Sequence, residues 1–111
     1  MAGVSCPELA AAVSGAGGLG SLGLGAMTVT QAREAIHATR ALTARPFGVN
    51  VFCHRENVPE AETVARWLAW LRPEFARFGG APPSTLRPLY RSFLGHDEML
   101  DMLVEERPAF L

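Results

Sequence analysis

Helices are expected in four segments of this chain, from capping patterns and from the spacing of apolar residues. An Ala-rich helix should begin near Ser5, because Ser5 and Glu8 form an S-x-x-E capping box and Pro7 suits a first turn. A longer helix is predicted over residues 59–78 by one apolar stripe at helical spacing. The stripe consists of Val64, Leu68, Leu71, Phe75 and Phe78.

The other two helices are predicted from signals of the same kind. Residues 30–42 follow a capping box of Thr28 and Gln31. Their common face would contain Ala32, Ala35, Ile36, Thr39 and Leu42. A last helix is predicted over residues 98–106, with Asp97 as its cap. Its inward side chains would be Met99, Leu100, Leu103 and Val104.

Strands are predicted between these helices. Residues 19–22 form a short candidate strand, and residues 47–52 form a β-rich apolar run after a proline. The second run is apolar on both faces except at Asn50, as is typical of strands buried in parallel sheets. The final residues, "AFL", have the pattern of a strand that has just begun. The alternation of helices and strands therefore predicts parallel βα units in an α/β fold.

A glycine run lies between the first helix and the first strand. Its letters "GAGGLG" match the G-x-G-x-x-G dinucleotide pattern. That pattern binds a pyrophosphate only when a strand precedes it and a helix begins on it. Here the order is reversed, so we expect Gly15 and Gly17 to end the helix and the other glycines to allow close backbone packing.

Composition narrows the functional classes. The chain has 111 residues and a formal net charge of −1, which gives no electrostatic case for nucleic acid or a membrane surface. Apolar residues make up 49% and charged residues 19%, as in a globular protein, and no apolar run is long enough for a membrane span. No signal peptide is apparent. We expect a cytoplasmic chain in which Cys6 and Cys53 are reduced, with Cys6 a small buried residue.

Several segments together resemble one enzyme family. The N-terminal stretch "MAGVSCPELAAAVSGAGGLGSLGLGAMT" is similar to that of the nitronate monooxygenases, once called 2-nitropropane dioxygenases. The similarity continues through "ALTARPFGVNVF", "LRPEFARFG" and "SFLGHDEMLDMLVEERP" and covers essentially the whole chain. The resemblance implies an FMN-dependent (β/α)8 TIM barrel, which takes about 250 residues. Residues 1–111 would then be the N-terminal portion of a single FMN-binding barrel domain, with the first βα units present and strand one missing.

The resemblance also implies an activity and its site residues. Family members oxidise alkyl nitronates with O2 and use no metal, and their active-site histidine is expected beyond residue 111. Asn50 is the polar residue of "FGVNVF" near a strand end, and a buried amide there needs partners such as FMN atoms. The backbone of Met1, Ala2 and Gly3 would lie against the flavin. Tyr90, the single tyrosine, would line the nitronate pocket and donate from its phenol.

Other chemistry-bearing residues receive weaker roles. The adjacent pair Cys53 and His54 has no chelate spacing, so no metal site is expected, and His54 is assigned to the rim of the site. His37 and His96 are expected at the surface near helices. Two tryptophans, Trp67 and Trp70, would cover the outside of the barrel or a contact surface.

Two alternatives remain at this stage. Within the same fold, the chain could belong to another flavin barrel reductase, acting on an enoyl-acyl-carrier substrate or on a quinone. In a different class, it could be a catalytically silent fragment or an interaction subunit that completes a barrel with a complementing C-terminal polypeptide. Parallel strands with unpaired edges would leave the isolated chain marginally stable, and it would bind FMN weakly or not at all.

Overall fold

The computed structural model describes residues 3–56 and 58–111, which form two compact units. The first unit combines the chain up to Arg55 with Tyr90–Leu111, and the second is Glu56–Leu89. No helix among these residues is long and apolar enough to cross a membrane.

The first unit is built around a parallel sheet. Along the chain its elements are α1 (Pro7–Gly15), β1 (Gly20–Gly23), α2 (Val29–Leu42), β2 (Phe47–Asn50) and α4 (Asp97–Glu106). The strands β1 and β2 pair in parallel, from Gly20 opposite Phe47 to Gly23 opposite Asn50. On the other side of β2, Phe110 forms a parallel bridge with Gly48. The prediction that "AFL" begins a third parallel strand is therefore confirmed.

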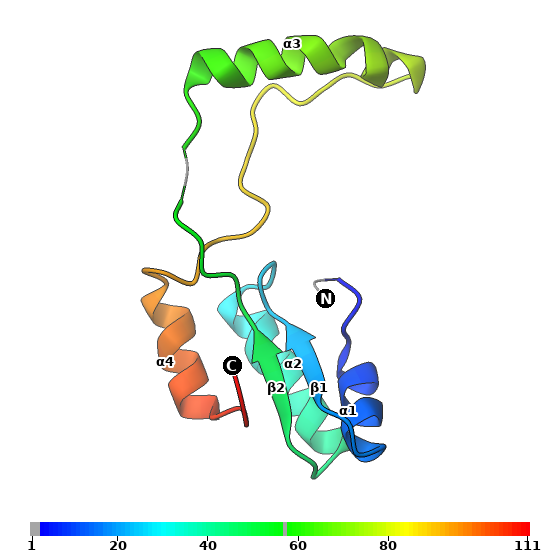
Figure 1. Ribbon diagram of the computed structural model, residues 1–111, viewed down its shortest axis with the longest axis vertical. Helices are drawn as coiled ribbons and strands as arrows, with labels where there is room; N and C mark the ends of the chain where they lie inside the picture. Colours follow the sequence, from blue (N-terminus) through cyan, green and yellow to red (C-terminus); the bar gives the residue numbers. More distant parts are fainter. Residues whose placement is uncertain (1–2, 57) are drawn as a thin grey trace. The chain divides into compact units, whose positions relative to one another are not determined.

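Helices cover one face of this sheet. Helix α2 lies behind the two strands, with α1 and α4 to either side (Figure 1). Leu22 and Val49 are opposite each other in the register and point toward α2, where they pack with Ile36. Side chains alternate along a strand, so Ser21, Gly23, Gly48 and Asn50 belong to the opposite face.

Two glycines of the run are required by the backbone, one by its conformation and one by close packing. Gly17 follows α1 with φ +86°, a conformation that glycine adopts without strain. Gly20 lies so close to α1 that a Cβ there would overlap the carbonyl oxygen of Ala10. Its N–H donates to Ser14 Oγ (3.1 Å), and Ser14 Oγ donates to Pro46 O (2.9 Å), so one hydroxyl joins α1 to the starts of both strands. The expectation of a helix stop followed by close packing is confirmed.

The start of α1 differs from the prediction. Its N-cap is Cys6 and not Ser5, and the Cys6 side chain makes no capping hydrogen bond. Pro7 disfavours the helical conformation for the residue before it, and Cys6 is accordingly extended, with φ −99° and ψ 165°. Cys6 is also exposed and not buried, because it precedes the first helical residue and the buried part of α1 begins only at Ala10.

Helix α2 begins as predicted. Thr28 Oγ1 accepts from Gln31 N (3.2 Å), and Gln31 Oε1 accepts from Thr28 N (2.9 Å), which is the complete capping box. Ala32, Ile36 and Thr39 are buried, but Leu42 is 56% exposed and does not continue their face. It is the last residue of α2, beyond the part of the helix that packs on the sheet.

Helix α4 is rotated relative to the prediction. Its N-cap is His96, which is buried and not on the surface, and Asp97 is already the first helical residue. Leu100 and Val104 are exposed, and the expectation that they point inward is wrong. Met99 and Leu103 are buried as expected, and Met102 and Glu106 are buried in place of Leu100 and Val104.

The second unit is one helix and a returning segment. Helix α3 (Ala61–Arg77) confirms the long helix, and the segment after Gly80 runs back along it without regular structure. Leu68 is buried against this segment. Phe78, which the predicted stripe includes, is 86% exposed, because it is the C-cap after the last residue of α3. Trp67 and Trp70 are exposed and stacked, with ring centroids 4.9 Å apart.

Candidate functional site

The candidate site lies at the carboxyl ends of β1 and β2. Asn50 is the last residue of β2, directly opposite Gly23 in the register. Its side chain is exposed, contrary to the expectation of a buried amide, because the residue opposite has no side chain to cover it. The backbone carbonyl of Asn50 accepts from Leu24 N (2.9 Å), which fixes the strand end. Within the described part of the chain its carboxamide makes no hydrogen bond and can donate and accept toward a ligand.

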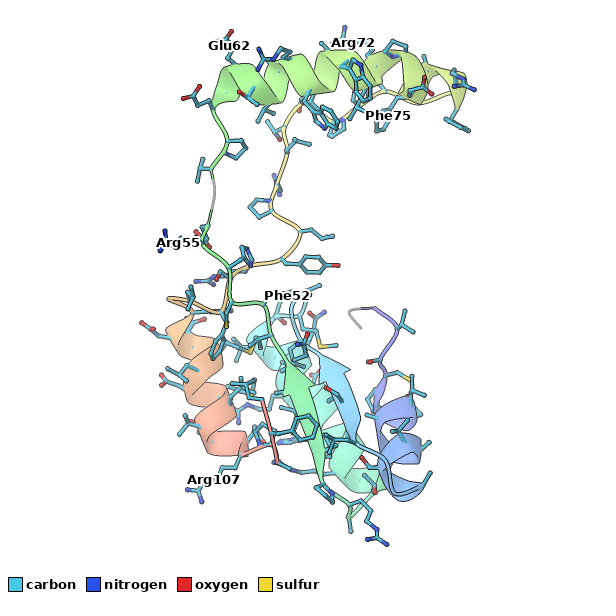
Figure 2. All side chains as sticks on the ribbon, in the orientation of Figure 1. Phe52, Arg55, Glu62, Arg72, Phe75 and Arg107 are labelled. Atoms are coloured by element: carbon cyan, nitrogen blue, oxygen red, sulfur yellow. The ribbon has the colours of Figure 1, made fainter. Side chains whose placement is uncertain are left out.

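An aromatic pair adjoins Asn50. Phe52 continues the strand direction two residues later, on the same side of the chain as Asn50, and Figure 2 shows it just beyond the end of β2. A Cβ at Gly25 would overlap the Phe52 ring, so the ring lies directly on the Gly25 backbone. The Tyr90 ring contacts Phe52, with centroids 4.8 Å apart and planes inclined at 51°. The structure thus brings Tyr90 to the strand ends where Asn50 lies.

Hydrogen bonds hold Tyr90's segment to the strand end. Phe93 N donates to Phe52 O (2.8 Å), and Ser92 Oγ donates to His54 O (2.6 Å). Ser92 is 1% exposed, so the donor of this bond is buried although His54 itself is exposed. The chain leaves the first unit after Arg55 and returns at Tyr90, and these two bonds join the outgoing and returning segments.

Gly3 lies near the same edge. It has φ +76° and lines an open cavity of about 540 Å³ together with Gly23, Met27 and Gln31. Gly3 is therefore close to the carboxyl end of β1, beside the strand that carries Gly23 opposite Asn50. The other two residues assigned to the flavin loop, Met1 and Ala2, lie outside the described residues.

The cysteines and histidines do not form a ligand cluster. Cys53 and His54 are both exposed, and the described residues contain no group of three or more His, Cys, Asp or Glu side chains placed to hold a metal ion. Cys6 and Cys53 are both free thiols. What His54 contributes to the edge is its backbone carbonyl, the acceptor for Ser92.

The strongest electrostatic feature lies at the opposite end of the strands. The side chain of Glu106 is 7% exposed and accepts from Arg33 Nη1 (2.6 Å), from Arg40 and from His37 Nε2 (2.9 Å). Burial alone would raise the pKa of Glu106, but the hydrogen bonds from Arg40, His37 and Arg33 outweigh it and lower that pKa. The hydrogen bond to Glu105 in turn raises the pKa of Arg33. This cluster joins α2 to α4 and is remote from the carboxyl ends of the strands, where Asn50 lies.

Sequence patterns missed three contributors to the site: Gly25, Phe52 and Ser92. In the sequence, Gly25 is one of 11 glycines, and Phe52 is one more apolar residue of a predicted strand. Ser92 carried no signal because its partner, the His54 carbonyl, is a backbone atom. The useful signal would have been the strand register, which places residues 25 and 52 on the same face.

Comparisons with known proteins place the chain in a family. The family model for nitronate monooxygenase matches residues 1–82. A nitronate monooxygenase of Paraburkholderia phytofirmans is 53% identical over 111 residues, covering 100% of this chain and 30% of that protein. One of Pseudomonas aeruginosa is 49% identical over 109 residues, covering 98% and 31%.

Solved structures agree with this assignment. A nitroalkane oxidase from Streptomyces ansochromogenes superposes with a TM-score of 0.73 at 39% identity, over 97% of this chain and 30% of that one. FabK from Thermotoga maritima superposes less well, with a TM-score of 0.56 at 30% identity, over 97% and 22%. The chain spans about a third of the length of the relatives that it matches. With a family model over most of its length and a relative that matches it from end to end, the chain belongs to the nitronate monooxygenase family.

Proposed function

We propose that this chain is the N-terminal part of an FMN-dependent nitronate monooxygenase that oxidises alkyl nitronates with O2. The observation that carries the proposal is the 53% identity to a nitronate monooxygenase over the whole chain. The strands support it further: β1, β2 and the bridge at Phe110 are parallel and follow one another in chain order, as in the first part of a (β/α)8 barrel. Residues 1–111 would form part of that single barrel domain, in a cytoplasmic enzyme.

The strand ends fit a flavin. Barrel enzymes hold their ligands at the carboxyl ends of the strands, where Asn50 lies. The exposed Asn50 carboxamide can both donate and accept, and the flavin edge carries carbonyl and N–H groups that match it. Gly23, opposite Asn50, adds no side chain beside the amide. Gly3 and, by resemblance, Met1 and Ala2 would bring backbone to the same ligand. The flavin would supply the exchange of electrons with the nitronate and with O2.

Tyr90 would bind the substrate. A nitronate carries its negative charge on the two oxygens of the nitro group, and a phenol O–H can donate to either of them. No hydrogen bond joins the Tyr90 hydroxyl to another described residue, so this donor is available. The role of Tyr90 would be to orient the nitronate beside the flavin, and the active-site histidine that the resemblance implies would lie beyond residue 111.

The similarity to FabK motivates a second candidate, a flavin reductase with the same fold. Its TM-score and identity are both lower than those of the nitroalkane oxidase, so we place it second, together with a quinone reductase. A third possibility is that the chain is catalytically silent, either as a fragment or as an interaction subunit that completes a barrel with a second polypeptide. Substrate preference separates the first two, and activity after assembly separates both from the third.

Co-expression with the missing part of a barrel tests the proposal. The chain would be produced with the corresponding C-terminal two-thirds of the Paraburkholderia phytofirmans relative, and each piece would also be produced alone. We expect a yellow complex that consumes O2 when propionate 3-nitronate is added, and no such activity from either piece. A flavin-loaded complex that reduces an enoyl or quinone substrate but ignores nitronates would refute the proposal.

Asn50→Ala in the same complex tests the flavin contact. Removing one hydrogen-bonding group should weaken FMN binding about three- to tenfold, measured by fluorescence titration of the apoprotein. Thr30→Ala, at an exposed position of α2, is the control and should leave FMN affinity unchanged. Equal FMN affinity in N50A and the unaltered chain would remove Asn50 from the flavin site.

A further inference from the structure

We propose that Phe52 is a positioning residue that fixes the orientation of Tyr90, and that Gly25 provides the space in which Phe52 lies. The inference rests on the proposed function of Tyr90 as a ligand of the nitronate. It assigns a role to two residues that carry no polar group and contact no reacting atom.

The first step is the contact between Phe52 and Gly25. The ring lies against the backbone of residue 25 so closely that any side chain at that position would overlap it. One side of the ring is therefore held by backbone, which cannot rotate away as a side chain can. Phe52 is still 37% exposed, so burial in the core does not account for its placement.

The second step is the contact between Phe52 and Tyr90. The two rings are 4.8 Å apart at an inclination of 51°, within the range of favourable edge-to-face geometries. Phe52 also accepts a backbone hydrogen bond from Phe93, three residues after Tyr90. The same residue therefore fixes both the ring of Tyr90 and the segment that carries it.

The third step concerns the segment of Tyr90 itself. It lies in neither a helix nor a strand, and its neighbours Leu89 and Arg91 are exposed. Among the described residues, Phe52 is the ring that Tyr90 contacts. Without that contact the phenol would sample several rotamers, and a hydrogen-bond donor that must reach one substrate oxygen would lose its fixed direction.

Fluorine NMR measures this contact directly. Tyr90 is the single tyrosine, so fluorotyrosine labelling of the 111-residue chain gives one resonance that reports on its ring. In Phe52→Leu we expect that resonance to move toward the position of free fluorotyrosine, because the ring current of Phe52 is lost. Phe110→Leu, which removes another ring from the same face of the sheet, is the control and should leave the resonance in place. An unmoved resonance in F52L overturns the proposal.

A second variant covers the case in which F52L fails to fold. Gly25→Ala keeps the Phe52 ring but displaces it, so the Tyr90 resonance should also move. Gly15→Ala is its matched control, because a Cβ at Gly15 meets nothing within 4 Å. If G25A leaves the resonance where G15A leaves it, Gly25 has no part in positioning Tyr90.

Kinetics of the completed barrel separate positioning from folding. F52L should raise KM for the nitronate about three- to tenfold, the effect of losing one hydrogen bond, with FMN content unchanged and kcat within about twofold. Phe52→Tyr retains the ring and should restore KM. If the complex oxidises no nitronate, the proposed function fails while the NMR result stands. If the nitronate is oxidised with the same KM in F52L, positioning fails while the function stands.

Discussion

At the scale of single residues, the backbone contacts of glycine are the strongest constraints in this chain. Gly20 and Gly15 belong to the same run, but their surroundings differ. Residue 20 is pressed against the Ala10 carbonyl and Ser14, whereas residue 15 faces open space. The glycines of the run are therefore not equivalent: Gly15 ends α1, whereas Gly20 allows the close approach of β1 to α1.

Gly20→Ala tests this difference. The added methyl must push α1 away from β1 and disturb the bond from Gly20 N to Ser14, so we expect a loss of about 2 to 4 kcal/mol in the free energy of unfolding. Gly15→Ala should instead be neutral or stabilise the helix by up to about 1 kcal/mol. Urea denaturation followed by circular dichroism measures both. A G20A chain as stable as G15A would show that α1 and β1 are not in close contact.

At the scale of elements, the packing of α4 against α2 is organised by a buried charge. Glu106 faces Arg33, Arg40 and His37 of α2 and is almost fully buried. The pKa of Glu106 is lowered in the folded state, so the ionised carboxylate stabilises the fold. This stabilisation is complete above the unfolded-state pKa near 4.5 and is lost as the pH falls through the lower pKa of the folded state. The junction between α2 and α4 should thus weaken in acid.

Glu106→Gln tests this electrostatic contribution. At neutral pH we expect the free energy of unfolding to fall by about 1 to 3 kcal/mol, less than for a fully buried pair because the arginines are partly exposed. The difference in the free energy of unfolding between E106Q and the unaltered chain should narrow as the pH drops below 4.5. Glu105→Gln is the matched control. The Glu105 side chain is 63% exposed, so its replacement should lower the free energy of unfolding by about 0.5 kcal/mol or less. A difference between E106Q and the unaltered chain that stays constant with pH would contradict a stabilising role for the charge of Glu106.

The same helix shows what the sequence could and could not predict. Local rules were sufficient for the Thr28–Gln31 capping box, for the two strands and for the strand start at the end of the chain. They placed Leu100 and Val104 inside because both are apolar, yet Glu106 determines which side of α4 is buried. Partners for a buried carboxylate come from α2, far along the chain, and hydropathy carries no information about them. The site was limited in the same way: Asn50 and Tyr90 were identified by residue type and resemblance, whereas the contact between Phe52 and Gly25 depends on the register.

At the scale of the whole molecule, the chain consists of a sheet unit and an excursion from it. The excursion, Glu56–Leu89, leaves and returns beside the bonds that join Ser92 to His54 and Phe93 to Phe52. Because those bonds lie within the first unit, that unit does not require the excursion to bring its two segments together.

Excision of the excursion tests this independence. Replacing Glu56–Leu89 with a flexible linker about a fifth as long should stabilise the sheet unit by about 1 kcal/mol, since a shorter loop costs less entropy to close. Thermal unfolding followed by circular dichroism measures the change, and a linker of unchanged length is the control. Loss of cooperative unfolding in the shortened chain would mean that the helix α3 contributes to the stability of the sheet unit.

The overlap between Gly25 and the Phe52 ring also imposes an order on evolution. While the ring is present, any side chain at residue 25 must displace it, so a substitution there disturbs the contact between Phe52 and Tyr90. Once residue 52 has become smaller, residue 25 is free to change, and a return to phenylalanine is then blocked until glycine is restored. Gly48 stands in the same relation to Phe110. Relatives of this chain should therefore vary at position 25 only in lineages that have first lost the ring at position 52, and each such loss becomes harder to reverse as substitutions accumulate behind it.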